Sequence, residues 1–297
     1  MKIAAAAYPL DFLDNWDSYA SKLTTWVEQA VGEGAQLLVF PEYGAMELAA
    51  LGGKAIAADL EASLREVARH REAVDALHLA LAARHGVHIL GASGPVFEGA
   101  RPVNRATFYG PKGIIGHQDK QIMTRFESEE WDVVAGDGLV LFETTLGRIG
   151  VLICYDSEFP LLARRLAQAG AEVLLVPSCT ETLAGFTRVR VGSMARALEN
   201  QCVVVHAATV GSAAWCPAVD LNTGCGAIYC PPDHGWPSTG IVVETALNVP
   251  GWACAEISLE AVRKVRAEGG VLNHRDWAEQ EKRRPEVKLL RDNAVCP

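Results

Sequence analysis

The chain has 297 residues, of which 49% are hydrophobic and 21% are charged, a balance typical of a globular protein with a large core. Its formal net charge is −9, and no cluster of Lys and Arg stands out, which argues against a nucleic-acid surface because phosphate recognition needs clustered cations. The start of the chain, 1–8, reads as a first strand and not as a signal peptide, and no apolar stretch approaches the roughly 20 residues that cross a bilayer, so we expect a soluble, cytoplasmic protein.

Apolar runs alternate with helix-periodic stretches along most of the chain, which predicts a layered α/β fold. The predicted strands are 2–7, 36–40, 87–92, 101–109, 114–120, 139–144, 148–153, 173–176, 202–208 and a short one near 227–230, and the predicted helices are 16–31, 60–85, 160–169 and 188–200.

Two other stretches stand apart from this alternation. Residues 211–238 are rich in Gly, Pro, Cys and Trp and are predicted to form a long loop, of the kind that is often functional. The stretch from about 270, with its charged run 279–284, is predicted to be an arm over the surface or over a partner subunit. Because no linker or internal repeat interrupts the chain, we expect one domain spanning 1–297.

The eight cysteines are scattered through apolar segments, which favours reduced thiols over a disulfide framework in a chain read as having no secretory signal. Cys216, Cys225, Cys230 and His234 raise the question of zinc, but they contain no C-x2-C pair. The usual zinc spacing is therefore missing. We expect free thiols here, no metal site and no cofactor.

Cys154 is the most informative residue, because it stands where the apolar run 149–153 breaks into a polar turn. A strand holds such a thiol rigidly, and the turn after it leaves backbone N–H groups free to stabilise an oxyanion. A strand-end Cys is, however, more often a small buried hydrophobe. Other residues must decide between these two interpretations.

Two further polar residues follow apolar strands. Glu42 comes just after 37–40, where partial desolvation would raise the pKa of its carboxyl group toward neutrality and suit it to act as a general base. Lys120 ends the strand at 114–120, and an ammonium group near the thiol would lower the thiol pKa and stabilise an anionic intermediate. Taken singly, each could be a solvated surface residue. With Cys154 they become a catalytic group only if the fold brings all three together.

In these three segments the chain resembles the nitrilase superfamily of carbon–nitrogen hydrolases, whose pattern is a Glu, a Lys and a Cys in that order, each just after a strand. The matching segments are LLVFPEYG at 37–44, IIGHQDKQIMTRFE at 114–127 and GRIGVLICYDSEFP at 147–160, and the similarity continues through 163–178 and 195–207. It covers nearly the whole chain, from residue 2 to about 257.

The resemblance implies a four-layer α-β-β-α sandwich with two central sheets, and assembly into a homodimer or a larger homo-oligomer. It also implies a mechanism that needs no metal or organic cofactor. Glu42 would be the general base, Cys154 the nucleophile that forms a thioester, and Lys120 together with the backbone N–H of Tyr155 the donors to the oxyanion.

The family also carries a second active-site Glu near the Lys. Glu127 fits this place best, because Lys120, Thr124, Glu127 and Trp131 match the pattern K-x3-T-x2-E-x3-W without a gap. Counting backward from Gly136 favours Glu129 instead, so Glu129 stays open as the alternative.

Other residues match family positions that mostly support the fold; these are Asn104, Arg105, Arg164, Arg196, Glu199 and Asn200. The segment after the strand at 173–176 enters the family's substrate pocket. Tyr155, Ser178 and Cys179 are therefore the expected substrate-binding residues. For Cys179, packing is the preferred interpretation over a second nucleophile.

The residues after the nucleophile bear on the reaction. True nitrilases usually show C-W-E, whereas Cys154-Tyr155-Asp156 is closer to the amidase and carbamoylase branches. We therefore expect hydrolysis of a small amide to an acid and ammonia, with a nitrile or an N-carbamoyl amino acid as alternative substrates. An acyltransferase and a non-catalytic scaffold remain less favoured alternatives. The small-molecule amide or nitrile is the expected partner, with no nucleic acid and no membrane.

Overall fold

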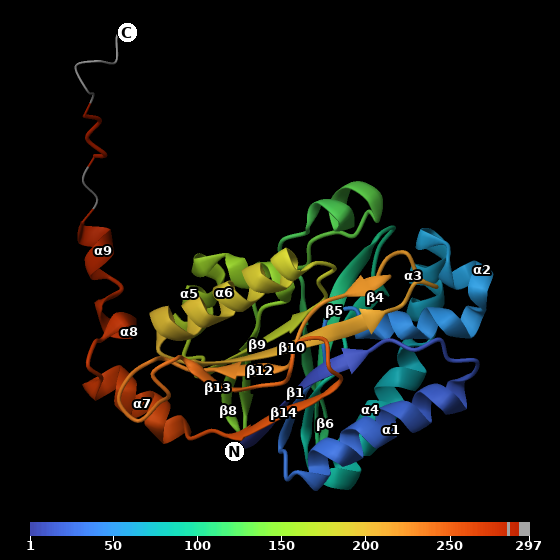
Figure 1. Cartoon of the computed structure of the whole chain (residues 1–297), viewed down its shortest axis with the longest axis horizontal. Helices are drawn as coiled ribbons and strands as arrows, with labels where there is room; N and C mark the ends of the chain where they lie inside the picture. Colours follow the sequence, from blue (N-terminus) through green and yellow to red (C-terminus); the bar gives the residue numbers. More distant parts are fainter. Residues whose placement is uncertain (284–285, 291–297) are drawn as a thin grey trace.

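The strands of the protein form one hydrogen-bonded sheet. The computed structural model describes residues 1–283 and 286–290, and within these residues fourteen strands are joined, nine of them in the order β4-β5-β3-β2-β1-β10-β9-β8-β7 (Figure 1). Their bounds are β1 Lys2–Pro9, β2 Leu37–Val39, β3 His88–Leu90, β4 Gly94–Phe97, β5 Pro102–Gly110, β6 Gly113–Asp119, β7 Leu141–Thr144, β8 Gly147–Val151, β9 Val173–Ser178, β10 Val203–Ser212, β11 Leu221–Asn222, β12 Ala227–Tyr229, β13 Ile241–Glu244 and β14 Gly251–Glu256.

The sheet is folded into two facing halves that are joined at β1 and β10. These two strands pair in parallel only over their last residues, Ala7 to Pro9 with Ala208 to Val210, and elsewhere each pairs with strands of its own half. The far strands then come face to face, because the rings of Phe108 on β5 and Phe142 on β7 lie 5.3 Å apart. The α/β class is confirmed. The two predicted sheets are in fact the halves of one strongly curled sheet, as strand twist allows.

Helices cover the outer side of each half (Figure 1), which completes the predicted order of four layers. The layer on the first half contains α1 (Trp16–Gly32) and α4 (Arg71–His85), and the layer on the second contains α5 (Pro160–Gln168) and α6 (Leu183–Asn200). The other helices are η1 Gly44–Gly52, α2 Lys54–Ala57, α3 Leu60–Arg69, η2 Phe126–Glu130, η3 Cys154–Glu158, α7 Leu259–Glu268, α8 Asn273–Asp276 and α9 Glu279–Lys282.

Alternation along β1 distributes its small side chains between two cores. Ile3 and Ala5 belong to the core between the half-sheets, whereas Ala4 and Ala6 pack in the core under α1. Successive side chains of a strand point to opposite faces. Because both faces are covered, the strand is apolar throughout, which is why its sequence reads as a continuous hydrophobic run.

The predicted helix at 60–85 is wrong as one element, because α3 ends at Arg69 and α4 begins at Arg71. Between them His70 has ψ near 0, and its ring stacks on Trp16 while Nε2 contacts Glu66 at 3.0 Å. Since the break contains no Gly or Pro, it is marked only by a local contact to Glu66 in α3 and a tertiary contact to Trp16.

Other predicted bounds also shift. The helix predicted at 188–200 begins five residues earlier, at Leu183, where the Thr182 hydroxyl accepts from the Gly185 N–H (3.1 Å) and caps it. Several elements have no counterpart among the predicted ones, including the strands β4, β11, β13 and β14 and the helix α7.

The segment after α7 first packs on the body and then leaves it. His274 donates its N–H to Gln201 Oε1 (3.1 Å), and the Arg164 guanidinium lies 4.9 Å from the centre of the Trp277 ring. Farther along, α9 points away from the body (Figure 1). The predicted arm extends beyond the described residues, since 284–285 and 291–297 lie outside them, so its contact with a partner stays a prediction.

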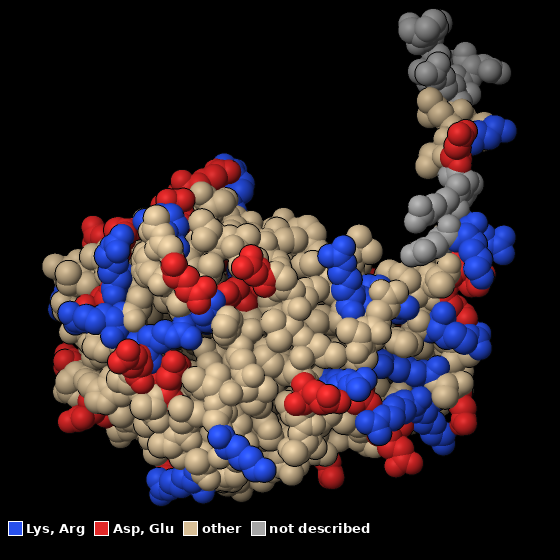
Figure 2. All heavy atoms as spheres, turned by 180° about the vertical axis from the view of Figure 1, so that it is seen from behind, with Lys and Arg blue, Asp and Glu red and all other residues tan. Residues whose placement is uncertain are grey.

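Two further features concern the charge of the surface and the hydrophobicity of the helices. On the face opposite that of Figure 1, acidic and basic side chains are interspersed, and a broad area without charged side chains lies between them (Figure 2). In the part of the chain that the structure describes, no helix is both long and apolar enough to cross a membrane.

Candidate active site

The site lies at one edge of the sheet, where strands that run in the same direction end. β2, β1, β10, β9 and β8 are parallel neighbours, and two antiparallel steps from β3 give β6 the same direction. Glu42, Lys120, Cys154 and Cys179 follow β2, β6, β8 and β9 respectively. The curl of the sheet therefore brings together side chains that are far apart in the sequence.

Lys120 lies between two carboxylates. Its Nζ is 2.7 Å from Glu42 Oε1 and 2.6 Å from Glu127 Oε2, and all three side chains are almost completely buried. Burial alone would lower the pKa of the ammonium group, but the two carboxylates outweigh it and raise that pKa well above its usual value. Lys120 is therefore a fixed cation at the bottom of the site.

Glu42 is held by three donors. Besides Lys120, the Asn104 side-chain amide donates to Oε1 (3.0 Å) and the Cys179 backbone N–H donates to Oε2 (2.9 Å). Burial raises the pKa of Glu42 to about 7, Lys120 opposes that rise, and the charge of Glu127 adds to it. A carboxyl group with this pKa exchanges a proton readily at neutral pH.

Cys154 begins a tight 3-10 turn, η3, in a left-handed backbone conformation with φ of +50°. Its Sγ lies 3.9 Å from the backbone oxygen of Cys179, and its side chain is buried. Burial and the neighbouring Glu42 raise the thiol pKa well above its usual value, although Lys120 lowers it in part. The resting group is thus a thiol that needs a base, and Glu42 is near enough for its charge to raise the thiol pKa.

The structure places Glu127, and not Glu129, beside Lys120. Glu127 Oε1 accepts from the Tyr43 hydroxyl (2.8 Å), and Oε2 accepts from the Thr124 N–H and hydroxyl (2.9 and 2.8 Å). Burial would raise the pKa of this carboxyl group, but Lys120 and these donors lower it. Glu129 instead pairs with Arg125 in solvent.

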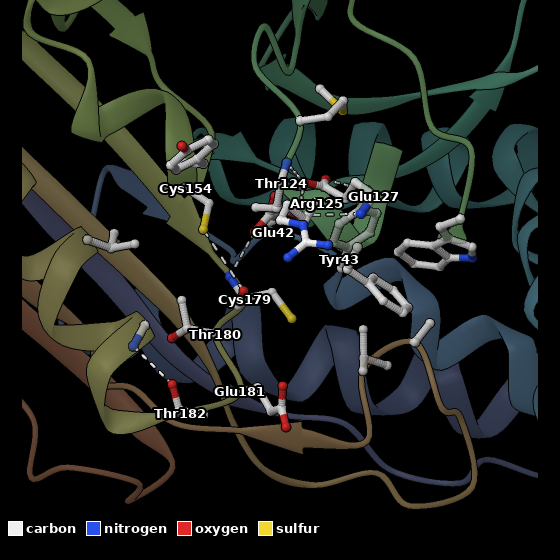
Figure 3. Close-up of a pocket in the computed structure, with 18 of the residues that line it drawn as sticks. Glu42, Tyr43, Thr124, Arg125, Glu127, Cys154, Cys179, Thr180, Glu181 and Thr182 are labelled. Carbon is white, nitrogen blue, oxygen red and sulfur yellow. Dashed lines mark hydrogen bonds between the residues drawn. The ribbon is translucent and has the colours of Figure 1, made fainter. Parts of the chain in front are cut away.

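A pocket of about 660 Å³ opens above these groups (Figure 3). Cys154 and Cys179 lie on one side of it and Tyr43 and Glu127 on the other. Its walls come from η2, from the start of α6 and from two loops, 179–182 and 217–221. The two loops are tied together, because the Thr180 hydroxyl donates to the Thr223 carbonyl (2.7 Å).

Two of the three expected substrate-binding residues line this pocket, namely Tyr155 and Cys179. Burial raises the pKa of the Cys179 thiol to about 12, so this second thiol is a weak nucleophile at neutral pH. Ser178 does not line the pocket. It lies behind the pocket with no exposed surface, and its hydroxyl contacts His206 Nε2 at 2.7 Å and the Ala207 carbonyl at 3.2 Å.

Within residues 1–283 and 286–290, no group of three or more His, Cys, Asp or Glu side chains is arranged to hold a metal ion. Cys216 packs in the core under α1, whereas Cys225 and Cys230 belong to separate positions of the second half. His234 lies exposed. All seven described cysteines are free thiols.

The sequence analysis assigned no role in the site to three residues that contact it. Tyr43, directly after Glu42, holds Glu127. Thr124 was noted only as part of a spacing, yet both of its donors bind the same carboxylate. Asn104 was expected to support the fold, yet it donates to Glu42 across 62 residues of sequence. Only Tyr43 and Thr124 had a local signal, namely their nearness to an expected catalytic residue.

Comparison with known proteins places these features in a family. The family model described as carbon-nitrogen hydrolase matches residues 2–265. The "Probable hydrolase YhcX" of Bacillus subtilis is 31% identical over 93% of this chain. The chain spans about half of that relative's length, 53%.

Two further proteins are similar over nearly their full length. The deaminated glutathione amidase of a Synechocystis species is 28% identical over 91% of this chain and 97% of its own. The crystal structure of a carbon-nitrogen hydrolase from Helicobacter pylori has a TM-score of 0.74 at 18% identity, covering 96% of this chain and 95% of the other. At that identity the likeness shows the same fold. This protein belongs to the carbon–nitrogen hydrolase family, the nitrilase superfamily.

Proposed function

We propose that this protein hydrolyses the C–N bond of a small amide through a thioester on Cys154. The observation that carries the proposal is one carboxylate, Glu42, which accepts from the Lys120 ammonium group and from the Cys179 N–H at the bottom of a pocket. The Cys154 Sγ lies 3.9 Å from the carbonyl oxygen of the same Cys179. This arrangement supplies a nucleophile, its base and a cation for developing negative charge.

In the first half-reaction, Glu42 takes the proton of the Cys154 thiol, and the sulfur attacks the carbonyl carbon of the amide. Lys120 and the backbone N–H of Tyr155 stabilise the resulting oxyanion. The protonated Glu42 then gives its proton to the nitrogen as the C–N bond breaks. Ammonia leaves, and the acyl group stays on sulfur as a thioester.

In the second half-reaction, Glu42 takes a proton from water, and the hydroxide attacks the thioester carbon. The C–S bond breaks, the carboxylic acid leaves, and the sulfur recovers its proton from Glu42. One water is consumed and one acid and one ammonia are formed. Glu127 keeps Lys120 in place and charged throughout, because its carboxylate is itself held by Tyr43 and Thr124.

An amide is favoured over a nitrile by two observations. The residues Cys154-Tyr155-Asp156 resemble the amidase and carbamoylase branches, and the Synechocystis relative is named as an amidase. The spacing around Lys120 resembles the nitrilase branch, so a nitrile is the second candidate.

The test is ammonia release from three parallel sets of compounds, namely short amides, N-carbamoyl amino acids and short nitriles. We expect the amides to be hydrolysed by the unaltered chain and by Cys254→Ala, whose thiol lies on β14 away from the pocket, but not by Cys154→Ala. Activity on nitriles alone would overturn the choice of an amide.

Two measurements distinguish the remaining alternatives. If the acyl group passes to amines instead of water, added hydroxylamine yields the hydroxamate as the main product, which identifies an acyltransferase. If the chain is a scaffold without turnover, no acyl adduct accumulates on Cys154 in the mass spectrum after rapid quenching with a substrate ester or amide.

A further inference from the structure

Asp156 lies two residues after the nucleophile but does not face the substrate. It is 1% exposed and is absent from the pocket wall. Its carboxylate accepts hydrogen bonds from three backbone N–H groups, those of Gln121 (3.2 and 3.1 Å), Ile122 (2.9 Å) and Ile153 (3.3 Å). The residue that resembles the amidase branch thus acts on the backbone and not on a ligand.

The three N–H groups belong to two separate segments. Gln121 and Ile122 directly follow Lys120, whereas Ile153 directly precedes Cys154. Asp156 therefore joins the loop that carries the ammonium group to the turn that carries the thiol.

The strands that lead to these two segments do not pair with each other. β6, which leads to Lys120, pairs with β5, and β8, which leads to Cys154, pairs with β7 and β9. Residues 119–125 and 152–158 are described in full, and every hydrogen bond between these two segments ends on Asp156. Asp156 is thus the one residue that joins these two segments directly by hydrogen bonds.

The group must accept hydrogen bonds on both oxygens. Oδ1 faces the N–H groups of Gln121 and Ile122, and Oδ2 faces those of Gln121 and Ile153. An ionised carboxylate only accepts, whereas protonation would add an O–H donor on an oxygen that faces backbone N–H groups. Burial raises the pKa of Asp156 to about 6, while the Gln121 N–H, the Lys120 charge and the other two N–H groups oppose the rise, so the ionised form prevails at neutral pH.

We propose that Asp156 is a positioning residue of the proposed hydrolysis, whose carboxylate sets the Lys120 ammonium group at its working distance from the Cys154 thiol. The proposal rests on the proposed function for its effect on turnover, but not for its effect on the thiol. A shift of about 1 Å in a catalytic group can cost on the order of a hundredfold in rate.

The test compares Asp156→Asn, Asp156→Glu and a control, Glu172→Gln. The Asn variant keeps the size but turns an amide N–H₂ toward backbone donors. The Glu variant keeps the two acceptor oxygens on a longer side chain. Glu172 is also a buried carboxylate, it binds Arg263 (2.6 Å), and it is not part of the pocket, so Glu172→Gln reports the effect of a comparable loss of stability alone.

Two readouts are measured, namely kcat and KM for a short amide, and the rate of Cys154 alkylation by iodoacetamide against pH. We expect Asp156→Asn to lower kcat about a hundredfold with KM changed less than about threefold, and to move the alkylation profile to higher pH, because the thiol loses the nearby cation. Asp156→Glu should recover part of both losses. Glu172→Gln should leave both unchanged.

Two outcomes overturn the proposal. An unshifted alkylation profile in Asp156→Asn would show that the carboxylate does not set the Lys120–Cys154 distance. Equal losses in Asp156→Asn and Glu172→Gln would reduce its role to stability. If the unaltered chain hydrolyses no amide, the proposed function fails, but the alkylation profiles still decide the role of Asp156.

Discussion

Cys154, the proposed nucleophile, has a left-handed backbone conformation, which is unfavourable for any residue with a side chain. A left-handed φ costs roughly 1–2 kcal/mol for a residue with a Cβ atom, and Cys154 has φ of +50°. Such strain is found where a turn must aim a reactive group. Here the turn directs the thiol into the pocket beside Glu42.

Two substitutions separate the strain from the chemistry. Cys154→Ala should abolish hydrolysis while changing the free energy of unfolding by less than about 1 kcal/mol, because alanine keeps the Cβ atom and removes one sulfur. Cys154→Gly should also be inactive but at least as stable as the alanine variant, since glycine adopts positive φ freely. Urea unfolding and ammonia release measure both. Amide hydrolysis by Cys154→Ala would contradict the assignment of the nucleophile.

The pKa of Glu42 predicts how activity depends on pH. Because burial raises it to about 7, the ionised base forms only as the pH passes through that region. We expect kcat/KM for a short amide to rise with pH and level off above about 7, and Glu42→Gln to be inactive at every pH. The apparent pKa in such a profile belongs to the interacting groups Glu42, Lys120 and Cys154 together. A profile that is flat between pH 5 and 8 would contradict this role.

The same shift has a consequence for stability. A carboxyl group whose pKa is higher in the folded state binds more protons there than in the unfolded state, so its contribution falls as the pH rises from its usual value of 4.5 to about 7. Glu127, whose pKa is lowered, acts in a separate window, because its contribution is lost only below 4.5. We therefore expect the free energy of unfolding to decrease with pH between 5 and 7 more steeply in the unaltered chain than in Glu42→Gln. Urea unfolding at several pH values measures this, and equal pH dependence in the two proteins would refute the raised pKa of Glu42.

The sequence predicted the residues of the site better than the way they are held. Glu127 could be preferred to Glu129 from the sequence, because it lies three residues after Thr124 and seven after Lys120, within one local segment. The donors to Glu42 could not be predicted in this way. Asn104 and the Cys179 N–H reach it across 62 and 137 residues of sequence, and only the curl of the sheet brings them there. Ser178 does not line the pocket, because its strand turns it toward His206.

At the scale of elements, local patterns predicted the long strands and helices but not their interruptions. β1 is a continuous apolar run, α1 begins after the capping residue Asn15, α5 begins with Pro160, and each of the three lies where predicted. The break at His70 has no such signal, because it contains no Gly or Pro and the His70 ring stacks on the distant Trp16. The strands β13 and β14 were also missed. β14 pairs with β1, at the other end of the sequence, and β13 pairs with β12, which is itself a short strand.

Gln201 links three elements at the end of α6. Its Nε2 donates to the carbonyls of Val265 (3.2 Å) and Val271 (2.8 Å), and its Oε1 accepts from the His274 N–H (3.1 Å). It does so from a left-handed conformation, with φ of +43°, in a buried position. The side chain thus fastens α7 and α8 to α6.

Gln201→Gly should destabilise the protein even though it relieves backbone strain. The relief is worth about 1 kcal/mol, whereas three hydrogen bonds of about 1 kcal/mol each are lost, which leaves a net loss of about 2 kcal/mol. Asn248→Gly is the matched control, because Asn248 also has a positive φ of +60° but is exposed and makes one side-chain hydrogen bond, to the Gly224 N–H. Its free energy of unfolding should change little. A Gln201→Gly variant more stable than the unaltered chain would show that the link contributes less than the strain.

At the scale of the whole molecule, the outer helical layer of the second half-sheet carries several exposed apolar side chains. Leu161 on α5 is 64% exposed, and Leu183 and Val191 on α6 are each 59% exposed. On α6, Leu183, Val191 and Leu198 fall on one side of the helix, within about 80° at 100° per residue. Exposed apolar residues gathered on one face indicate a surface that binds another protein.

We expect this surface, defined by Leu161, Leu183, Val191 and Leu198, to join two copies of the chain, since the family resemblance predicts a homodimer or larger assembly. Val191→Asp would place a charge in the middle of the buried interface and should shift the protein toward the monomer at micromolar concentration, whereas Val249→Asp should not, because Val249 is 51% exposed in the loop before β14. Sedimentation velocity or light scattering measures the mass of each. A monomeric unaltered chain, or equal dissociation in both variants, would refute the interface.

The same helix, α6, also supports the turn that carries the nucleophile, because Arg196 donates to the Ser157 carbonyl (3.0 Å). We therefore expect the monomeric variant to lose kcat more than its affinity for a short amide.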